Sequence, residues 1–198
     1  MTELLLVRHG LPVSGVQHPP LSPEGVEQAR RLGSWLKGED VDVLVSSPMR
    51  RARETADVLA AQMGHPVDAV VDDLREWDTD LPPRAYTAIE EMGPSDPRAL
   101  AIAEGRYDDF VPELDRDAFR RRVAGCLADV LDRWPVGRIA AVCHGGLINA
   151  MVGGVLEIPA LFWFNPGYTS ITRLRRMPGE RVVVQSVNET AHLVATRD

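Results

Sequence analysis

The sequence contains few cysteines and no recognisable export signal. Its only two cysteines are Cys126 and Cys143, too few for the disulfide framework that stabilises small secreted proteins. The N-terminal segment lacks the basic opening of a signal peptide, and Arg8 and His9 interrupt its apolar run. We therefore expect a cytoplasmic protein.

Long apolar segments are missing as well. The best candidate for a membrane span, residues 145–164, contains Asn149, Glu157 and Pro159. A helix that crosses a bilayer needs about 20 predominantly apolar residues. We expect this segment to form a buried helix and the loop after it, and we expect no membrane partner.

Positive charge is scarce, and lysine nearly absent. The net charge is −7, and Lys37 is the only lysine among 22 basic residues. An acidic chain is not expected to bind nucleic acid, because that function requires a basic face. The arginine excess matches a coding bias. An acidic protein that binds an anion must nevertheless gather positive charge locally, so the question is which arginines converge.

Motifs for metal and nucleotide binding are also absent. The sequence has no His-Glu-x-x-His, no Cys-x-x-Cys and no Gly-x-x-x-x-Gly-Lys-Ser/Thr, and its remaining histidines His18, His65 and His192 stand in unlike contexts. We predict neither a metal nor a cofactor. Cys143 precedes His144, but a small residue buried at a strand end explains it better than a thiol nucleophile does.

Three short apolar runs predict the centre of the fold. They are Leu4–Val7, Val41–Val45 and Ile139–Cys143, and none alternates with polar residues, as is typical of parallel strands that helices cover on both faces. A helical pattern follows each run, at Pro23–Leu36, Pro48–Met63 and Leu147–Leu156. The sequence therefore predicts a single α/β domain over 1–198 with a mostly parallel central sheet.

Serine followed by proline opens the first two helices. Ser22 precedes Pro23, and Ser47 precedes Pro48, a pair of residues favoured at the N-cap and the first helical position. We expect both serines to act as caps.

The rest of the chain predicts one more helix, a hairpin and an insertion. A helix is expected over Asp117–Trp134, and Ser170–Leu174 with Arg181–Val187 flank a Met-Pro-Gly turn. Between 78 and 115 the pattern dissolves into scattered prolines and charges, with a short helix expected near Pro97–Glu104. We interpret this segment as an insertion over one end of the sheet.

Polar residues follow each of the three predicted strands. The first ends in Arg8-His9-Gly10, the second in Ser46-Ser47-Pro48-Met49-Arg50-Arg51, and the third in His144-Gly145-Gly146. Ligands of open α/β sheets bind beyond the carboxyl ends of the strands. Two histidines and two arginine clusters at one edge therefore predict an anion site, with Gly10 permitting the turn that ends the first strand.

These residue types suit phosphoryl chemistry. A neutral imidazole is a nucleophile towards phosphorus, and nearby guanidinium groups lower its pKa, while arginine binds phosphate oxygens through paired hydrogen bonds. Helical spacing pairs Arg50 with Glu54 towards solvent and aligns Arg51 with the inward residues Thr55 and Leu59. The helix N-termini after Ser47 and Gly145 are expected to add N–H donors for the anion.

At this point the motifs resemble a known family. In order along the chain, they are similar to those of the histidine phosphatase superfamily, the phosphoglycerate-mutase-like proteins of the branch 1 type. The resemblance rests on Leu6–Gly10, Leu21–Gly25, Ser46–Pro48 with Arg51, Leu74–Glu76, His144–Gly146, Asn165, Ser170–Thr172 and Ala191–Leu193.

The resemblance implies a catalytic set without metal or cofactor. His9 is expected to attack phosphorus, with Arg8, Arg51 and His144 stabilising the transferring group. Glu76 is expected to protonate the leaving oxygen and then to help water attack the phosphohistidine. The implied phosphate-binding residues are Arg8, Gly10, Arg51, His144 and Gly145.

Departures from the family pattern bear on the proton donor and the substrate. The acid motif continues into Trp77-Asp78 rather than a glycine and a second glutamate, which makes Asp78 an alternative donor. The family's phosphate-contacting asparagine after Gly10 and its Gly-Glu-Ser motif are missing, which argues against a glycolytic mutase. A substrate carboxylate has no defined partner, although Arg84, Arg98 or Arg106 in the insertion could supply one.

The leading hypothesis is a phosphatase acting on a small phosphorylated metabolite, with the 78–115 insertion as a lid that selects the substrate. A phosphohistidine phosphoprotein phosphatase, a mutase and a catalytically weak phosphate-binding regulatory module remain alternatives. The sequence leaves open whether the protein is a monomer or a homodimer.

Overall fold

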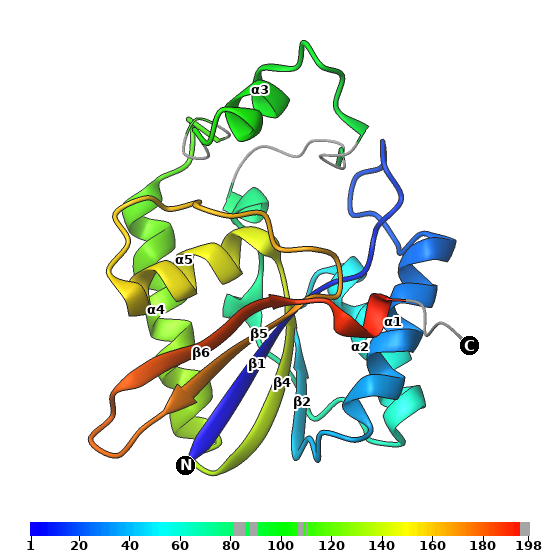
Figure 1. Ribbon diagram of the computed structural model, residues 1–198, viewed down its shortest axis with the longest axis vertical. Helices are drawn as coiled ribbons and strands as arrows, with labels where there is room; N and C mark the ends of the chain where they lie inside the picture. The colour runs from blue at the N-terminus through cyan, green and yellow to red at the C-terminus, as the bar shows by residue number, and fades with distance from the viewer. Residues whose placement is uncertain (81–85, 88–90, 107–108, 110, 195–198) are drawn as a thin grey trace.

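The computed structural model describes residues 1–80, 86–87, 91–106, 109 and 111–194. Within these residues one sheet of six strands has the order β3-β2-β4-β1-β5-β6. The neighbouring strands β3 and β2, β2 and β4, and β4 and β1 are parallel. Strand β5 is antiparallel to both β1 and β6. The predicted mostly parallel α/β sheet is thereby confirmed (Figure 1). The strands are β1 (Thr2–Arg8), β2 (Val43–Ser46), β3 (Ala69–Val70), β4 (Gly137–Cys143), β5 (Ile171–Arg176) and β6 (Val182–Glu189).

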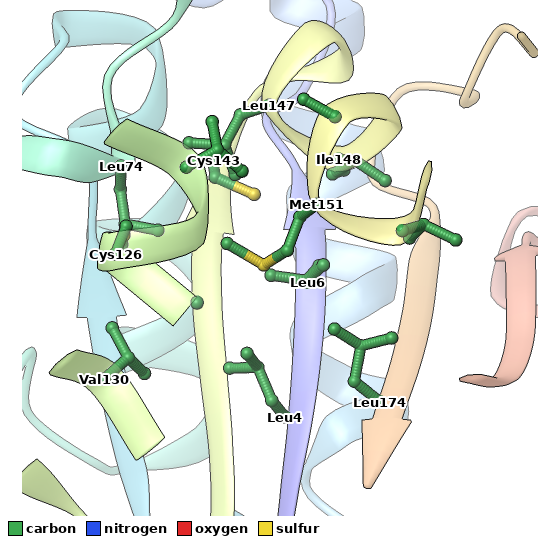
Figure 2. Close-up of a cluster of buried hydrophobic side chains, with 14 of the residues drawn as sticks. Leu4, Leu6, Leu74, Cys126, Val130, Cys143, Leu147, Ile148, Met151 and Leu174 are labelled. Carbon is green, nitrogen blue, oxygen red and sulfur yellow. The ribbon is translucent and has the colours of Figure 1, made fainter. Parts of the chain in front are cut away.

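Helices cover both faces of the sheet, as was predicted from apolar runs that do not alternate with polar residues. The helices α1 (Pro23–Leu36) and α2 (Arg50–Met63) cover one face, and α4 (Arg116–Arg133) and α5 (Gly145–Leu156) cover the other. Leu5 and Val7 of β1 pack towards the first pair, while Leu4 and Leu6 pack towards the second. Figure 2 shows Leu4 and Leu6 on the α4 and α5 side. No helix in the described part of the chain is long and apolar enough to span a bilayer.

The predicted caps are half right. Ser22 caps α1, because its Oγ accepts a hydrogen bond from the Gly25 N–H at 3.0 Å. Ser47 does not cap α2, which begins at Arg50 after Met49 without a side-chain cap. The Ser47 hydroxyl instead accepts the Met49 N–H at 3.3 Å and contacts the His144 ring.

The insertion lies over the carboxyl ends of the central strands, as Figure 1 shows. It contains α3 (Pro97–Ala103), where a helix was predicted, and begins with the 3₁₀ helix η2 (Trp77–Asp80), which follows η1 (Asp72–Leu74). The predicted hairpin is confirmed: β5 and β6 pair, and the Met177 N–H donates to the Arg181 carbonyl at 2.7 Å. A last 3₁₀ helix, η5, spans Ala191–Leu193.

Candidate active site

Two neighbouring parallel strands deliver the two histidines. Arg8 and Cys143 are opposite each other at the ends of β1 and β4, so His9 and His144 leave the sheet side by side. Their ring centroids are 5.1 Å apart, and both residues are buried. The predicted meeting of these motifs at one sheet edge is confirmed.

The His9 ring has one nitrogen fixed by the main chain. Its Nδ1 is 2.8 Å from the Gly10 carbonyl oxygen, which can only accept, so Nδ1 carries the hydrogen. Burial, followed by the charges of Arg51 and Arg8, holds the pKa of His9 well below its usual range. The ring is therefore neutral, and Nε2 keeps a lone pair.

Gly10 fixes the His9 ring. Its carbonyl accepts from His9, and its N–H donates to Thr55 Oγ1 at 3.1 Å. Both polar groups are thus used within the protein, which argues against the phosphate-binding role predicted for Gly10.

The φ angle of Gly10 is not positive, so the turn does not require glycine. A Cβ at this position would instead lie 2.5 Å from the Gly25 carbonyl oxygen.

Arg51 reaches the site from the first turn of α2, as its spacing predicted. Its Nε donates to His9 Nε2 at 3.1 Å, and its NH2 group donates to Asp78 Oδ2 at 3.2 Å. Arg50 points to solvent and pairs with Glu54 at 2.7 Å. The lone pair of the nucleophile candidate therefore accepts a hydrogen bond from a guanidinium group.

Arg8 lies between the main chain and an aromatic ring. Its NH1 group donates to the Pro166 carbonyl, and its guanidinium carbon lies 3.8 Å from the centroid of the Tyr168 ring. The Tyr168 hydroxyl in turn is 2.8 Å from the hydroxyl of Tyr86 in the insertion. Arg8 Nε has no hydrogen-bond partner among the described residues. Sequence reasoning missed both tyrosines, because neither belongs to a motif.

His144 presents its other ring nitrogen. Its Nε2 is 2.8 Å from Ser47 Oγ, whereas its buried Nδ1 has no hydrogen-bond partner in the described structure. Burial, followed by the charge of Arg51, holds the pKa of His144 well below its usual range. The ring is neutral, and a Ser47 hydroxyl that donates to Nε2 leaves Nδ1 as an N–H donor.

Glu76 is held against the N-terminus of α5. Its carboxylate accepts the N–H groups of Gly146 at 2.8 Å and Leu147 at 3.0 Å. Burial, together with the nearby charge of Asp78, raises the pKa of Glu76 to about 7. These two amides at the start of α5, expected to bind an external anion, are therefore taken by a carboxylate of the protein itself.

A guanidinium group from α4 holds the segment that carries this carboxylate. Arg122 NH1 donates to the main-chain carbonyls of Asp73 at 2.9 Å and Arg75 at 2.8 Å. Its NH2 group donates to the Glu76 carbonyl at 3.3 Å. Arg122 lies within the helix predicted over Asp117–Trp134, but sequence reasoning assigned it no role, since bonds to main-chain oxygens leave no trace in the partner's sequence.

A cavity opens where these groups converge. Arg8, His9, Arg51, Glu76, Asp78, Gly145 and Gly146 line one part of it. Side chains of the insertion and of the 162–166 loop line the rest. Burial raises the pKa of the neighbouring Cys143 thiol well above its usual range, which opposes a thiolate nucleophile. In the described structure no three His, Cys, Asp or Glu side chains are grouped as metal ligands.

Known proteins resemble the chain over most of their length. The chain is 29% identical over 206 residues to the uncharacterized phosphatase PhoE of Bacillus subtilis (strain 168), covering 98% of this chain and 97% of that protein. A phosphoserine phosphatase mutant from Entamoeba histolytica, solved in complex with phosphoserine, superposes with a TM-score of 0.74 at 25% identity, covering 98% of this chain and all (100%) of that one.

A mycobacterial glucosyl-3-phosphoglycerate phosphatase, solved in complex with VO3, superposes with a TM-score of 0.72 at 25% identity and covers 94% of this chain and 98% of that one. The model of the histidine phosphatase superfamily (branch 1) matches residues 4–190. The chain therefore belongs to the histidine phosphatase superfamily, branch 1.

Proposed function

We propose that the protein is a phosphatase that hydrolyses phosphate monoesters of small metabolites through a phosphohistidine on His9. The observation that carries this proposal is the fixed tautomer of His9. Because Nδ1–H donates to the Gly10 carbonyl, the lone pair of the neutral ring is on Nε2, where Arg51 places a guanidinium group. A phosphoryl group that takes over the Arg51 hydrogen bond would lie within reach of this lone pair.

In the first step His9 Nε2 forms a bond to phosphorus as the bond from phosphorus to the ester oxygen breaks. Arg8, Arg51 and the His144 Nδ1–H stabilise the charge on the transferring oxygens, and Gly145 lines the same part of the cavity. The alcohol leaves with a proton from Glu76. A pKa of about 7 keeps a large share of Glu76 protonated near neutrality.

In the second step Glu76, now a carboxylate, accepts a proton from water. The hydroxide oxygen bonds to phosphorus while the P–N bond breaks, which releases phosphate and returns the neutral imidazole. Glu76 suits this exchange better than Asp78, because Arg51 binds Asp78 as an ion-pair partner at 3.2 Å and the pKa of Glu76 is near the working pH.

The names of solved relatives support a phosphatase. Solved relatives with this fold are named as phosphatases for phosphoserine and glucosyl-3-phosphoglycerate, both small phosphate monoesters. The two cysteines, buried and without a disulfide, support a cytoplasmic location.

Phosphate release from p-nitrophenyl phosphate, with and without a chelator, tests the proposal. We expect wild-type release that resists the chelator and is abolished by His9→Ala. The control His65→Ala, at a histidine just after the end of α2, should retain activity. Labelled substrate should leave an acid-labile, base-stable phosphoryl group on the wild type alone. Turnover that survives His9→Ala would contradict the phosphohistidine route.

A further inference from the structure

The cavity has a second part whose wall differs in chemistry from the phosphate-binding part. It is formed by large apolar side chains of η2, of the insertion and of the loop after α5. They are Trp77, Met92, Ile102, Phe162 and Phe164. Trp77 and Phe162 form an edge-to-face pair with ring centroids 6.4 Å apart. An alcohol that enters this part meets mainly hydrocarbon and aromatic surface, and Tyr86, Thr87, Asn149 and Asn165 add polar groups to the lining of the cavity.

Arg98 is the cation that this apolar part contains. Arg8, Arg51 and Arg98 are the arginines that line the cavity within the described residues, and the first two surround His9. Arg98 stands at the start of α3 in the insertion. A substrate carboxylate would need its guanidinium group, since Arg98 is the one base of this wall outside the phosphate-binding part.

Asp96 already occupies that guanidinium group. Arg98 Nε donates to Asp96 Oδ1 at 3.1 Å, and NH2 donates to Oδ2 at 2.8 Å. The pKa of Asp96 is lowered to about 2, chiefly by these hydrogen bonds, so the carboxylate stays ionised at any working pH. A partner two residues away along the chain is present at a high effective concentration. Asp96 takes the Nε and NH2 edge of the guanidinium group, so a substrate carboxylate that approaches the remaining NH1 group meets a charge that is already neutralised.

The acidic residues of the cavity offer no partner to an anionic alcohol. Asp78 lines it as the ion-pair partner of Arg51, and Glu76 lines it as the proposed proton donor, so neither attracts a second negative group on the substrate. Arg106, a candidate partner for a carboxylate by sequence, is exposed and pairs with Glu104 at 2.7 Å. Arg84, the other candidate, lies outside the described residues.

We propose that the enzyme selects phosphate esters of uncharged, largely apolar alcohols, an inference that rests on the proposed phosphatase activity. Asp96 sets this selectivity by neutralising Arg98 at the apolar wall of the cavity. Phosphate esters that also carry a carboxylate are then poor substrates. Asp96 acts as a specificity-determining residue although it does not touch the reacting atoms.

Three alkyl phosphates of similar length test the selectivity of the wild type. They are n-butyl phosphate, glycerol 1-phosphate and 4-phosphonooxybutanoate, which are apolar, polar and anionic beyond the ester oxygen. We expect kcat/KM to fall in that order, by about tenfold or more from the first to the last. An equal or higher kcat/KM for the carboxylated ester would overturn the inference and leave the phosphatase intact. Absence of turnover on all three and on p-nitrophenyl phosphate would instead overturn the proposed function.

The variant Asp96→Asn tests the mechanism of selectivity. Asp96 caps α3 by accepting the Arg98 N–H at 2.9 Å, and asparagine caps helices as well as aspartate, so α3 should persist while the guanidinium charge is released. We expect kcat/KM for 4-phosphonooxybutanoate to rise about tenfold, with that for n-butyl phosphate within about twofold of wild type. Adding Arg98→Gln should abolish the gain.

Asp115→Asn is the matched control. Asp115 caps α4 through the Ala118 N–H at 2.9 Å and does not line the cavity. This variant should leave the preference between the two esters unchanged. A gain for both esters alike in Asp96→Asn, or the same gain in Asp115→Asn, would overturn the role assigned to Asp96.

Discussion

Arg122 donates a hydrogen bond to the main-chain carbonyl of Glu76 at 3.3 Å. The same guanidinium group also holds the carbonyls of Asp73 and Arg75. The segment that carries the proposed proton donor is thus tied to α4, while the carboxyl group itself is tied to α5. Two helices on one face of the sheet together fix the position of one acid.

Replacing Arg122 with methionine should therefore impair proton donation more than phosphate binding. Esters with poor leaving groups depend most on the acid, so we expect kcat for n-butyl phosphate to fall about 100-fold, while kcat for p-nitrophenyl phosphate falls by less than about tenfold. KM should change little for either ester. Arg121→Met, at an exposed position one residue away, is the control. An equal loss on both esters would indicate a structural role alone.

Asp78→Asn should move the alkaline limit of activity to lower pH. The negative charge of Asp78 helps to raise the pKa of Glu76 to about 7, so removing it lowers that pKa and Glu76 loses its proton earlier as pH rises. In the pH profile of kcat/KM for n-butyl phosphate, we expect the alkaline limit to move down by on the order of half to one pH unit. The ester itself titrates near pH 6, but equally for both enzymes. Asp57→Asn, exposed on α2, should not shift the profile, and a fixed limit in Asp78→Asn would contradict the coupling.

A methyl group at Gly146 should displace the acid. A Cβ there would clash with Trp77 Cδ1 and lie 2.6 Å from Glu76 Oε1. We expect Gly146→Ala to lower kcat about 100-fold and to lower the melting temperature. Gly154, on the same helix, has nothing within 4 Å of its Cβ position. Gly154→Ala should keep full activity and raise the free energy of unfolding by about 0.5–1 kcal/mol.

Glu39 should make the fold sensitive to acid. Arg173 donates to both of its carboxylate oxygens at 3.0 Å, and these hydrogen bonds hold the pKa of Glu39 below its usual range. The stabilisation is therefore complete above the unfolded pKa, about 4.3, and is lost as pH falls through the lower folded pKa. Thermal melts should show Glu39→Gln about 2–4 °C below wild type at pH 7, with the difference vanishing near pH 3. Glu27→Gln, which removes an exposed pair, should match wild type at both pH values.

Much of the site follows from local sequence, because its residues stand at the ends of apolar runs. The strand that ends at Arg8 and the one that ends before His144 are each recognisable alone, and parallel pairing then brings their ends together. The inward position of Arg51 follows from helical spacing. Strand β3 was not predicted, since two residues, Ala69–Val70, carry no periodicity.

Contacts to the main chain and contacts between distant loops could not be predicted from the sequence. The bonds of Arg122 end on carbonyl oxygens, which every residue possesses. Ser47 looked like a cap because capping is the usual role of serine before a proline, whereas here His144, from a strand far along the chain, also binds its hydroxyl. The Tyr86–Tyr168 contact joins two irregular segments, for which sequence patterns give no register.

The central position of β1 in the sheet has a consequence for how the chain folds. Thr2 pairs with Gly137 on one side and with Arg176 on the other, so β1 is synthesised well before either of the strands that it pairs with. Such long-range pairing slows folding, and the bare Leu4–Val7 run is a candidate for chaperone capture until β5 emerges. His9, the proposed nucleophile, follows that run and would become competent only when the sheet closes, so turnover would report that the chain has finished folding.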